Sequence, residues 1–181
     1  MKIYCSIFLL IGFSISCSQA QINNAELQKM YNDDQTARSE ANIDWLKLDK
    51  ADSLREKRVY QLLKSKQVLT APDYENAALI FQHGADSVAY KMAVKMMEKA
   101  VEIDLNINRW LLAAATDRYL VSIGKPQIYG TQYYKETREG PFLMCDLDTT
   151  KINDEERRKF NVPTLAEQKL KLIEMNRNIR N

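Results

Sequence analysis

The stretch that decides the fold is residues 85–123, ADSVAYKMAVKMMEKAVEIDLNINRWLLAAATDRYLVSI, which runs directly into GKPQIYGTQYY at 124–134. The first segment contains neither glycine nor proline, and its apolar residues recur at helical spacing. More than half of the glycines and prolines in the chain then gather over 18 positions, at Gly124, Pro126, Gly130, Gly140 and Pro141. The sequence therefore predicts a helical body that ends near Gly124 and is followed by an irregular loop.

Composition supports the same fold class and excludes several functions. Five glycines and four prolines in 181 residues are about 5%, where ordinary usage is about 12%, which argues against a turn-rich β-sandwich or barrel. One histidine and three cysteines exclude a zinc finger, a disulfide scaffold and a multi-histidine metal site. A net charge of +2 lacks the excess of positive charge that is typical of a nucleic-acid-binding domain. We expect no cofactor, no metal and no nucleic-acid partner.

The patterns predict an all-α, single-domain protein, built as a helical bundle or helix-hairpin array with a long irregular loop around 124–145. The capping boxes Thr70–Asp73 and Thr164–Glu167 mark two helix starts. Helices are expected at 25–48, 52–67, 72–84, around 89–103, at 108–122 and from 165 onward. No strand is predicted, and the short segment 142–145 is the sole candidate.

The N-terminus has the pattern of an export signal. Lys2 precedes the apolar run 7–13, which is too short to span a bilayer as a mature helix. The segment Ser14-Ile15-Ser16-Cys17 favours a lipoprotein signal peptide over 1–16 with lipidation of Cys17. The alternative is ordinary cleavage after Ala20.

These boundaries imply a linker at 17–24, a helical domain at 25–175 and a frayed tail at 176–181. We expect an exported bacterial protein, held in the cell envelope as a periplasm-facing lipoprotein that touches the membrane only through the lipid on Cys17. With cleavage after Ala20 it would be soluble in the periplasm or secreted.

Polar residues interrupt three otherwise apolar helix faces. Asp34 and Arg38 lie four residues apart on the inward stripe of the first helix, with Gln35 beside them. The pair Gln82-His83 follows an apolar run, and Asp117-Arg118 interrupts the helix at 108–122. Each could be a surface pair or a hydrogen-bonded core group; together they indicate a polar cluster that its members or a ligand must satisfy.

The loop that follows is rich in amide and phenol groups, which come from Gln127, Tyr129, Gln132, Tyr133 and Tyr134. Functional groups favour loops that a rigid scaffold supports. The alternative is a connector whose tyrosines cover the core.

Four motifs in this order resemble those of an uncharacterised bacterial domain family. They are Asp34-Gln35-x-x-Arg38, Gln82-His83, Asp117-Arg118 and Gln127-x-Tyr129-Gly130-Thr131-Gln132. The resemblance spans roughly residues 27–165. Members of that family often carry Gly-Trp-Pro before the third helix, where this chain keeps only the proline, Pro72. The resemblance implies a shared site and no named activity.

Three functional hypotheses follow. In the first, the domain binds an unknown polar or anionic small molecule, or a protein, through Asp34, Gln35, Arg38, Gln82, Arg118, Gln127, Tyr129 and Gln132. In the second, it is a hydrolase- or transferase-like enzyme with His83 as general base, Asp117 or Asp34 orienting it, and Arg38 or Arg118 stabilising negative charge. In the third, these residues form a purely structural hydrogen-bond network.

Overall fold

The computed structural model describes residues 22–177, and the predicted all-α class is confirmed there. Among the described residues, none of the helices combines the length and apolar character needed to cross a bilayer. The helices are α1 (Ala25–Arg38), α2 (Trp45–Lys64), α3 (Ala71–Gln82), α4 (Ser87–Ile103), α5 (Trp110–Ser122), α6 (Asp154–Lys159) and α7 (Leu165–Arg177). The strands are β1 (Tyr133–Lys135) and β2 (Phe142–Met144).

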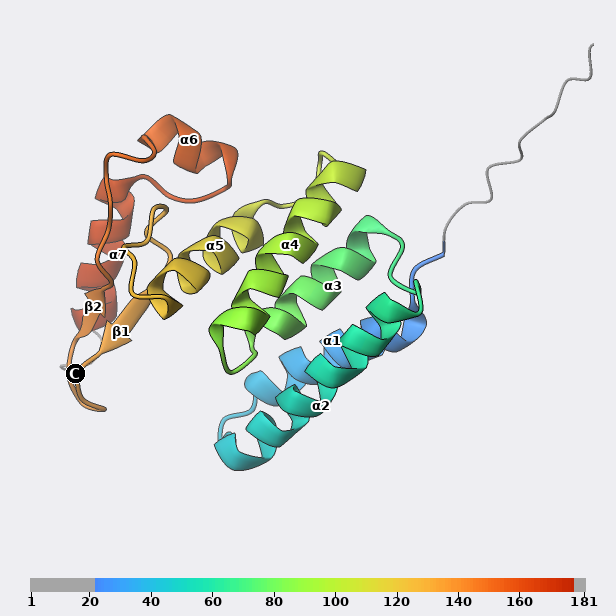
Figure 1. Cartoon of the computed structure of the whole chain (residues 1–181). Coiled ribbons are helices and arrows are strands. Elements are labelled where there is room, and N and C mark those ends of the chain that lie inside the picture. The colour runs from blue at the N-terminus through green and yellow to red at the C-terminus, as the bar shows by residue number, and fades with distance from the viewer. Residues whose placement is uncertain (1–21, 178–181) are drawn as a thin grey trace, which may run out of the picture.

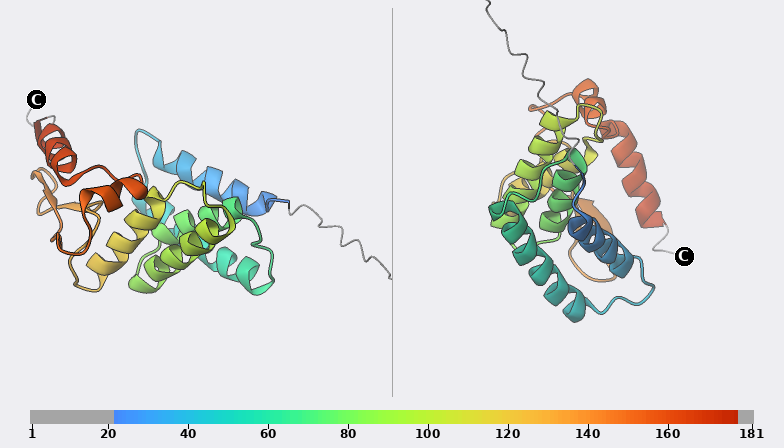
Figure 2. Two further views of the ribbon diagram at one scale, coloured as in Figure 1. Left: turned by 90° about the horizontal axis from the view of Figure 1, so that it is seen from above. Right: turned by 90° about the vertical axis from the view of Figure 1, so that its right-hand side faces the viewer.

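The elements follow one another across an elongated molecule (Figure 1). The α1–α2 pair packs against α3, which forms an antiparallel hairpin with α4, and α5 covers the other side of α4. The loop after α5, the β1–β2 hairpin, α6 and α7 form the far end. The view from above places the start of α1 and the end of α7 at opposite ends of the array (Figure 2).

Side-chain caps explain where the central helices begin. Thr70 and Asp73 form the predicted capping box at the start of α3, with proline in its first turn. Asp86 caps α4 by accepting from the backbone N–H groups of Val88 and Ala89, each at 2.9 Å. Because such caps satisfy otherwise unpaired N–H groups, they fix where α3 and α4 begin.

The predicted first helix, 25–48, is wrong, because the chain breaks between α1 and α2. Ser39 ends α1, and Asp44 caps a new helix by accepting from the N–H of Lys47 at 3.1 Å. Trp45 continues the apolar spacing but is 63% exposed at the start of α2. The helix predicted at 52–67 therefore covers the C-terminal part of the longer α2 and extends three residues past its end.

The C-terminal part also differs from the prediction. Residues 142–144 do form a strand, which pairs antiparallel with 133–135 inside the segment predicted as irregular. A short helix, α6, precedes the predicted last helix. Asn176 belongs to α7 and its side chain binds both backbone groups of Phe142, at 2.7 and 2.9 Å, so the predicted frayed tail does not begin there. Residues 178–181 lie outside the described residues.

Two apolar clusters hold the array together, and α5 belongs to both. The larger cluster joins α1–α5 around Leu27, Leu62, Phe81 and Met97, all fully buried. The smaller one packs Ala113 of α5 against Tyr129, Val162 and part-buried Phe160. The loop after α5 is therefore part of the packed structure, with its own core on the outer face of that helix.

Gly130 lets this loop pass close to α7. Its φ is +89°, and a Cβ placed there would lie 2.0 Å from Oε1 of Gln168. Gln168 cannot move away freely, because its Nε2 donates to the carbonyls of Tyr129 and Pro163 at 2.9 and 2.8 Å. Both backbone conformation and space thus require glycine.

Substitution of Gly130 by alanine should lower the free energy of unfolding by about 3 kcal/mol, since it combines a left-handed residue with overpacking. Gly124 is the matched control: its φ is +70°, but a Cβ placed on it would have no heavy atom within 4 Å. Gly124→Ala should cost about 1 kcal/mol, the conformational part alone. Denaturant unfolding measures both, and equal losses would contradict the close approach to Gln168.

Candidate functional site

A buried carboxylate joins the first three helices. Asp34 of α1 is fully buried, and its Oδ2 lies 2.8 Å from Nδ1 of His83 at the end of α3. Its Oδ1 lies 3.1 Å from Nη2 of Arg55 on α2, an ion pair outside hydrogen-bonding geometry. Gln35 adds a hydrogen bond from Nε2 to Oδ2 at 2.9 Å. The predicted Asp34–Arg38 pair is thus the buried kind, with Nε of Arg38 3.4 Å from Oδ1.

Two arginines share a second carboxylate in this cluster. Asp52 of α2 accepts from Nη2 of Arg38 at one oxygen and from Nη2 of Arg55 at the other, both at 2.6 Å. The cluster therefore contains two carboxylates and two guanidinium groups, so that its charges balance. Balanced pairing of this kind is what allows ions to be buried at all.

His83 is the residue of this cluster with a choice of proton positions. Its Nδ1 faces both Oδ2 of Asp34 at 2.8 Å and Nε of Arg38 at 2.9 Å. A proton on Nδ1 is donated to the carboxylate and leaves Nε2 free to act as a base. Without that proton, Nδ1 accepts from Arg38 and the neutral ring carries its proton on Nε2.

The pKa of Asp34 reports the strength of this pairing. Burial alone would raise it, but the hydrogen bond and charge of His83, the charge of Arg38 and the hydrogen bond from Gln35 lower the pKa from 3.8 to about 2. Asp34 is therefore ionised throughout the neutral range and imposes its negative charge on the histidine ring.

A second polar group continues from the end of α3 to α5 and the loop. Arg118 donates from Nη1 to the carbonyl of Gln82 at 2.7 Å and from Nε to Oε1 of Gln132 at 3.3 Å. Its guanidinium lies 5.6 Å from the centre of the Tyr90 ring. Burial lowers the pKa of Arg118, and the charge of Arg38 lowers it further. The positive charges of Arg38 and Arg118 therefore repel each other, although the two side chains belong to separate hydrogen-bond groups.

A third group fastens the loop and is closed to ligands. Asp117 is fully buried and accepts four hydrogen bonds of 2.8–2.9 Å, from the N–H groups of Ile128, Tyr129 and Thr131 and from the Thr131 hydroxyl. Gln127, also fully buried, bonds to both backbone groups of Gln132. This geometry favours an anchoring role for Asp117 over the predicted catalytic one, because no acceptor position is left for a substrate.

Arg157 completes the third group from the opposite side. It is 2% exposed and donates to the carbonyls of Tyr129 at 3.2 Å and Ile128 at 3.3 Å. The loop peptides thus lie between a buried carboxylate, which accepts hydrogen bonds from their N–H groups, and a buried guanidinium, which donates hydrogen bonds to their carbonyls. Burial of Tyr129 raises the pKa of its phenol, so this side chain stays protonated as part of the small core.

His83 lines an open cavity of about 280 Å³ between α2 and the turn after α3, which we call the His83 cavity. Its other lining residues are Asp49, Asp52, Ser53, Glu56, Gly84 and Ala85. Four of them lie on one face of α2 at spacings of three and four residues. Burial, and secondarily the charge of Asp86, raises the pKa of Glu56. Across residues 22–177, no three His, Cys, Asp or Glu side chains are grouped as ligands of one metal ion.

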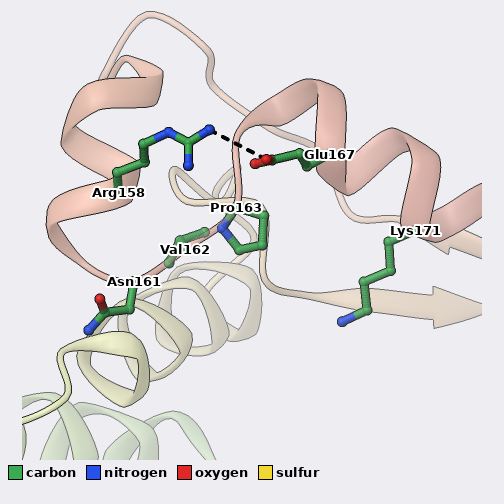
Figure 3. A pocket seen from close by; sticks show the side chains of 6 residues that line it. All are labelled: Arg158, Asn161, Val162, Pro163, Glu167 and Lys171. Atoms are coloured by element: carbon green, nitrogen blue, oxygen red, sulfur yellow. Dashed lines mark hydrogen bonds and ion pairs between the residues drawn. The ribbon is translucent and has the colours of Figure 1, made fainter.

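A larger hollow of about 490 Å³ lies between α6 and α7 (Figure 3). Arg158 and Glu167 face each other across it at 3.4 Å, and Lys171 lies apart along α7. Apart from Val162, its lining residues are exposed surface side chains. It brings together none of the predicted site residues and lacks the converging polar groups that the His83 cavity has.

The predicted residues therefore come together in part. Asp34, Gln35, Arg38 and His83 form one cluster, and His83 alone among the predicted residues lines the cavity. Four residues of the site were not predicted: Asp52 and Arg55, which complete the ion pairs, and Asp49 and Glu56, which line the cavity. The signal was present as acidic residues at helical spacing along α2, a pattern that is also typical of a solvated face.

No family model, curated protein or solved structure matches this chain. The resemblance to an uncharacterised bacterial domain family stays a prediction. The site itself is therefore the basis for a functional proposal.

Replacement of Asp34 by asparagine should lower the free energy of unfolding at pH 7 by about 3 kcal/mol, because it leaves buried cationic partners uncompensated. The depressed pKa means that Asp34 stabilises the fold above pH 3.8 and loses this contribution as pH falls toward 2. The difference between wild type and variant should therefore shrink over that range, by about 2 kcal/mol. Denaturant unfolding at several pH values measures it.

Asp33→Asn is the matched control one residue away. Its carboxylate is 53% exposed and pairs with Lys29 at the surface, so its loss should change the free energy of unfolding by less than about 0.5 kcal/mol. A pH-independent difference between wild type and Asp34→Asn would contradict the lowered pKa.

Proposed function

We propose that this protein is a ligand-binding domain whose His83 cavity takes a small polar molecule that carries a cationic amine. The observation that carries the proposal is the set of carboxylates lining that cavity, Asp49, Asp52 and Glu56, together with one histidine. Clefts that combine few converging polar groups with a group of perturbed pKa are typical ligand sites.

Electrostatics favour a cation over an anion. Asp52 is neutralised by Arg38 and Arg55, but among the described residues no cationic side chain pairs with Asp49 or Glu56. Burial raises the pKa of Glu56, and the nearby negative charge of Asp86 adds to that rise. An ammonium group in the cavity would pair with these carboxylates. A volume of about 280 Å³ is far larger than a bare ion needs and suits a small organic molecule.

The anionic ligand expected from the arginines has less support. Arg38, one of the two arginines predicted to bind it, already binds Asp52 and lies beside Asp34, so its charge is neutralised within the protein. Arg118 lacks a carboxylate partner among the described residues, but it is held by Gln82, Gln132 and the Tyr90 ring. Neither guanidinium lines the His83 cavity.

An enzyme is the second candidate, and the 2.8 Å contact between Asp34 and Nδ1 of His83 favours it. A buried, ionised aspartate that accepts from Nδ1 orients the ring and makes Nε2 a better general base. Glu56, with its raised pKa, would be the acid of such a pair. Proton NMR of an amine held at saturating concentration separates the two candidates over time. A binding protein returns the molecule unchanged, whereas an enzyme converts it, and His83→Gln should stop that conversion.

The direct test is calorimetric titration with putrescine and ethanolamine, with acetate and inorganic phosphate as anionic counterparts. We expect saturable binding of at least one amine, weakened about tenfold by Glu56→Gln, which corresponds to about 1.4 kcal/mol. The pKa of Glu56 is raised above 4.5, so this carboxylate becomes protonated at a higher pH than an ordinary glutamate. As the pH is lowered, the affinity for the amine should therefore fall earlier than it would with an ordinary glutamate. The Glu56→Gln variant should lack this pH dependence.

Glu98→Gln on the exposed face of α4 makes the same charge change away from the cavity and should leave amine affinity unchanged. Binding of phosphate or acetate in place of the amines would overturn the cationic ligand, and an equal effect of both glutamine variants would overturn the site.

We further propose export as a lipoprotein, from the sequence pattern at residues 1–17; these residues lie outside the described ones. Mass spectrometry of the mature protein from its membrane fraction should find an N-terminal, acylated Cys17, and Cys17→Ser should remove both the lipid mass and the membrane association. A mature chain that begins with unmodified Gln21 would contradict lipidation and support cleavage after Ala20.

A further inference from the structure

A second cavity, of about 350 Å³, lies where α1, α3 and the start of α5 meet. It is separate from the His83 cavity and shares no lining residue with it. Two aromatic side chains line it, part-buried Tyr31 of α1 and Trp110 of α5, which is 45% exposed. We call it the Trp110 cavity. Its volume lies within the range of about 300–1,000 Å³ that is typical of small-molecule sites.

The amide groups of this cavity are fixed before any ligand arrives. Asn76 is 7% exposed and donates from Nδ2 to Oε1 of Gln28 at 3.1 Å. Gln28 in turn donates from Nε2 to Asn32 at 3.0 Å. This relay orients Asn76 and leaves its Oδ1 without a donor among the described residues. An amide oxygen that its neighbours orient and that has no partner among the described residues can accept from an external donor.

A carboxylate lies next to it on the same turn of α3. Glu75 lines the cavity, is part-buried, and pairs with no cation among the described residues. Burial raises the pKa of Glu75. The cavity therefore offers two free acceptors, from Glu75 and Asn76, beside an aromatic surface.

We propose that the Trp110 cavity binds a neutral sugar, with one ring packed against Trp110 and its hydroxyl groups donating to Glu75 and Asn76. Sugars present adjacent hydroxyl donors at one edge and apolar C–H groups on the ring faces, and the cavity presents acceptors and aromatic carbon in the same juxtaposition. No lysine or arginine lines it, so it supplies no charge for a phosphate or carboxylate. The two acceptors come from adjacent residues, Glu75 and Asn76, and neighbouring hydroxyl groups of one sugar ring can donate to both.

Tryptophan fluorescence reports on this site once the other tryptophan is removed. The chain has two tryptophans, and Trp45 is 63% exposed on α2, so Trp45→Phe leaves Trp110 as the sole reporter. Maltose, cellobiose and N-acetylglucosamine are the neutral probes, titrated into the millimolar range, and tetramethylammonium is the cationic one.

We expect a saturable change in Trp110 emission with at least one sugar and none with tetramethylammonium. Glu75→Gln in the same background should raise the dissociation constant about tenfold, as expected when one hydrogen bond to a charged acceptor is lost. Glu98→Gln is the matched charge control and should leave the dissociation constant unchanged. Glutamine is nearly isosteric with glutamate, and an unchanged melting temperature of Glu75→Gln verifies that the fold is intact.

Three results would overturn the proposal: no saturable change with any of the three sugars, a response to tetramethylammonium that exceeds the response to the sugars, or equal dissociation constants for Glu75→Gln and Glu98→Gln. Amine titrations of the His83 cavity monitor a different site, so the two proposals succeed or fail independently.

Discussion

The first three helices depend on one buried charge, the carboxylate of Asp34. An ionised group without solvent must receive compensation from every element that covers it. Arg38 provides it from the same helix, Arg55 from α2 and His83 from the end of α3. These contacts fix how α2 lies against α3, and the acidic face of α2 consequently meets the histidine across a cavity.

At the far end of the molecule, the buried charges are compensated mainly by hydrogen bonds to peptide groups and less by side chains of opposite charge. Asp117 accepts hydrogen bonds from N–H groups of the loop, and Arg157 donates hydrogen bonds to carbonyls of the same loop. The two ions are linked through the peptides between them, so each satisfies one side of the loop backbone. This arrangement buries an irregular segment that would otherwise carry unpaired polar groups, and it lets α5 have a second core on its outer face.

The central helices can be predicted from the sequence better than the site, because their signals are local. The capping box Thr70–Asp73 marks the start of α3, and the apolar stripe 89–103 describes α4. The break between α1 and α2 was missed because Trp45 extends an apolar spacing although its side chain is exposed. Asp34 and Asp117 both interrupt an apolar face, and nothing local distinguishes them. Only their partners do, since one meets arginine and histidine side chains and the other meets the backbone of a loop.

The groups that remain available to a ligand are those that this pairing leaves over. Arg38 and Arg55 are neutralised by Asp34 and Asp52, whereas Asp49 and Glu56, on the same face of α2, receive no cation from the described residues. The polar interruption of an apolar face therefore marks the buried pairs, which hold the helices in register, but not the carboxylates of the proposed binding site. In that proposal the unpaired carboxylates beside the pairs select a cationic ligand.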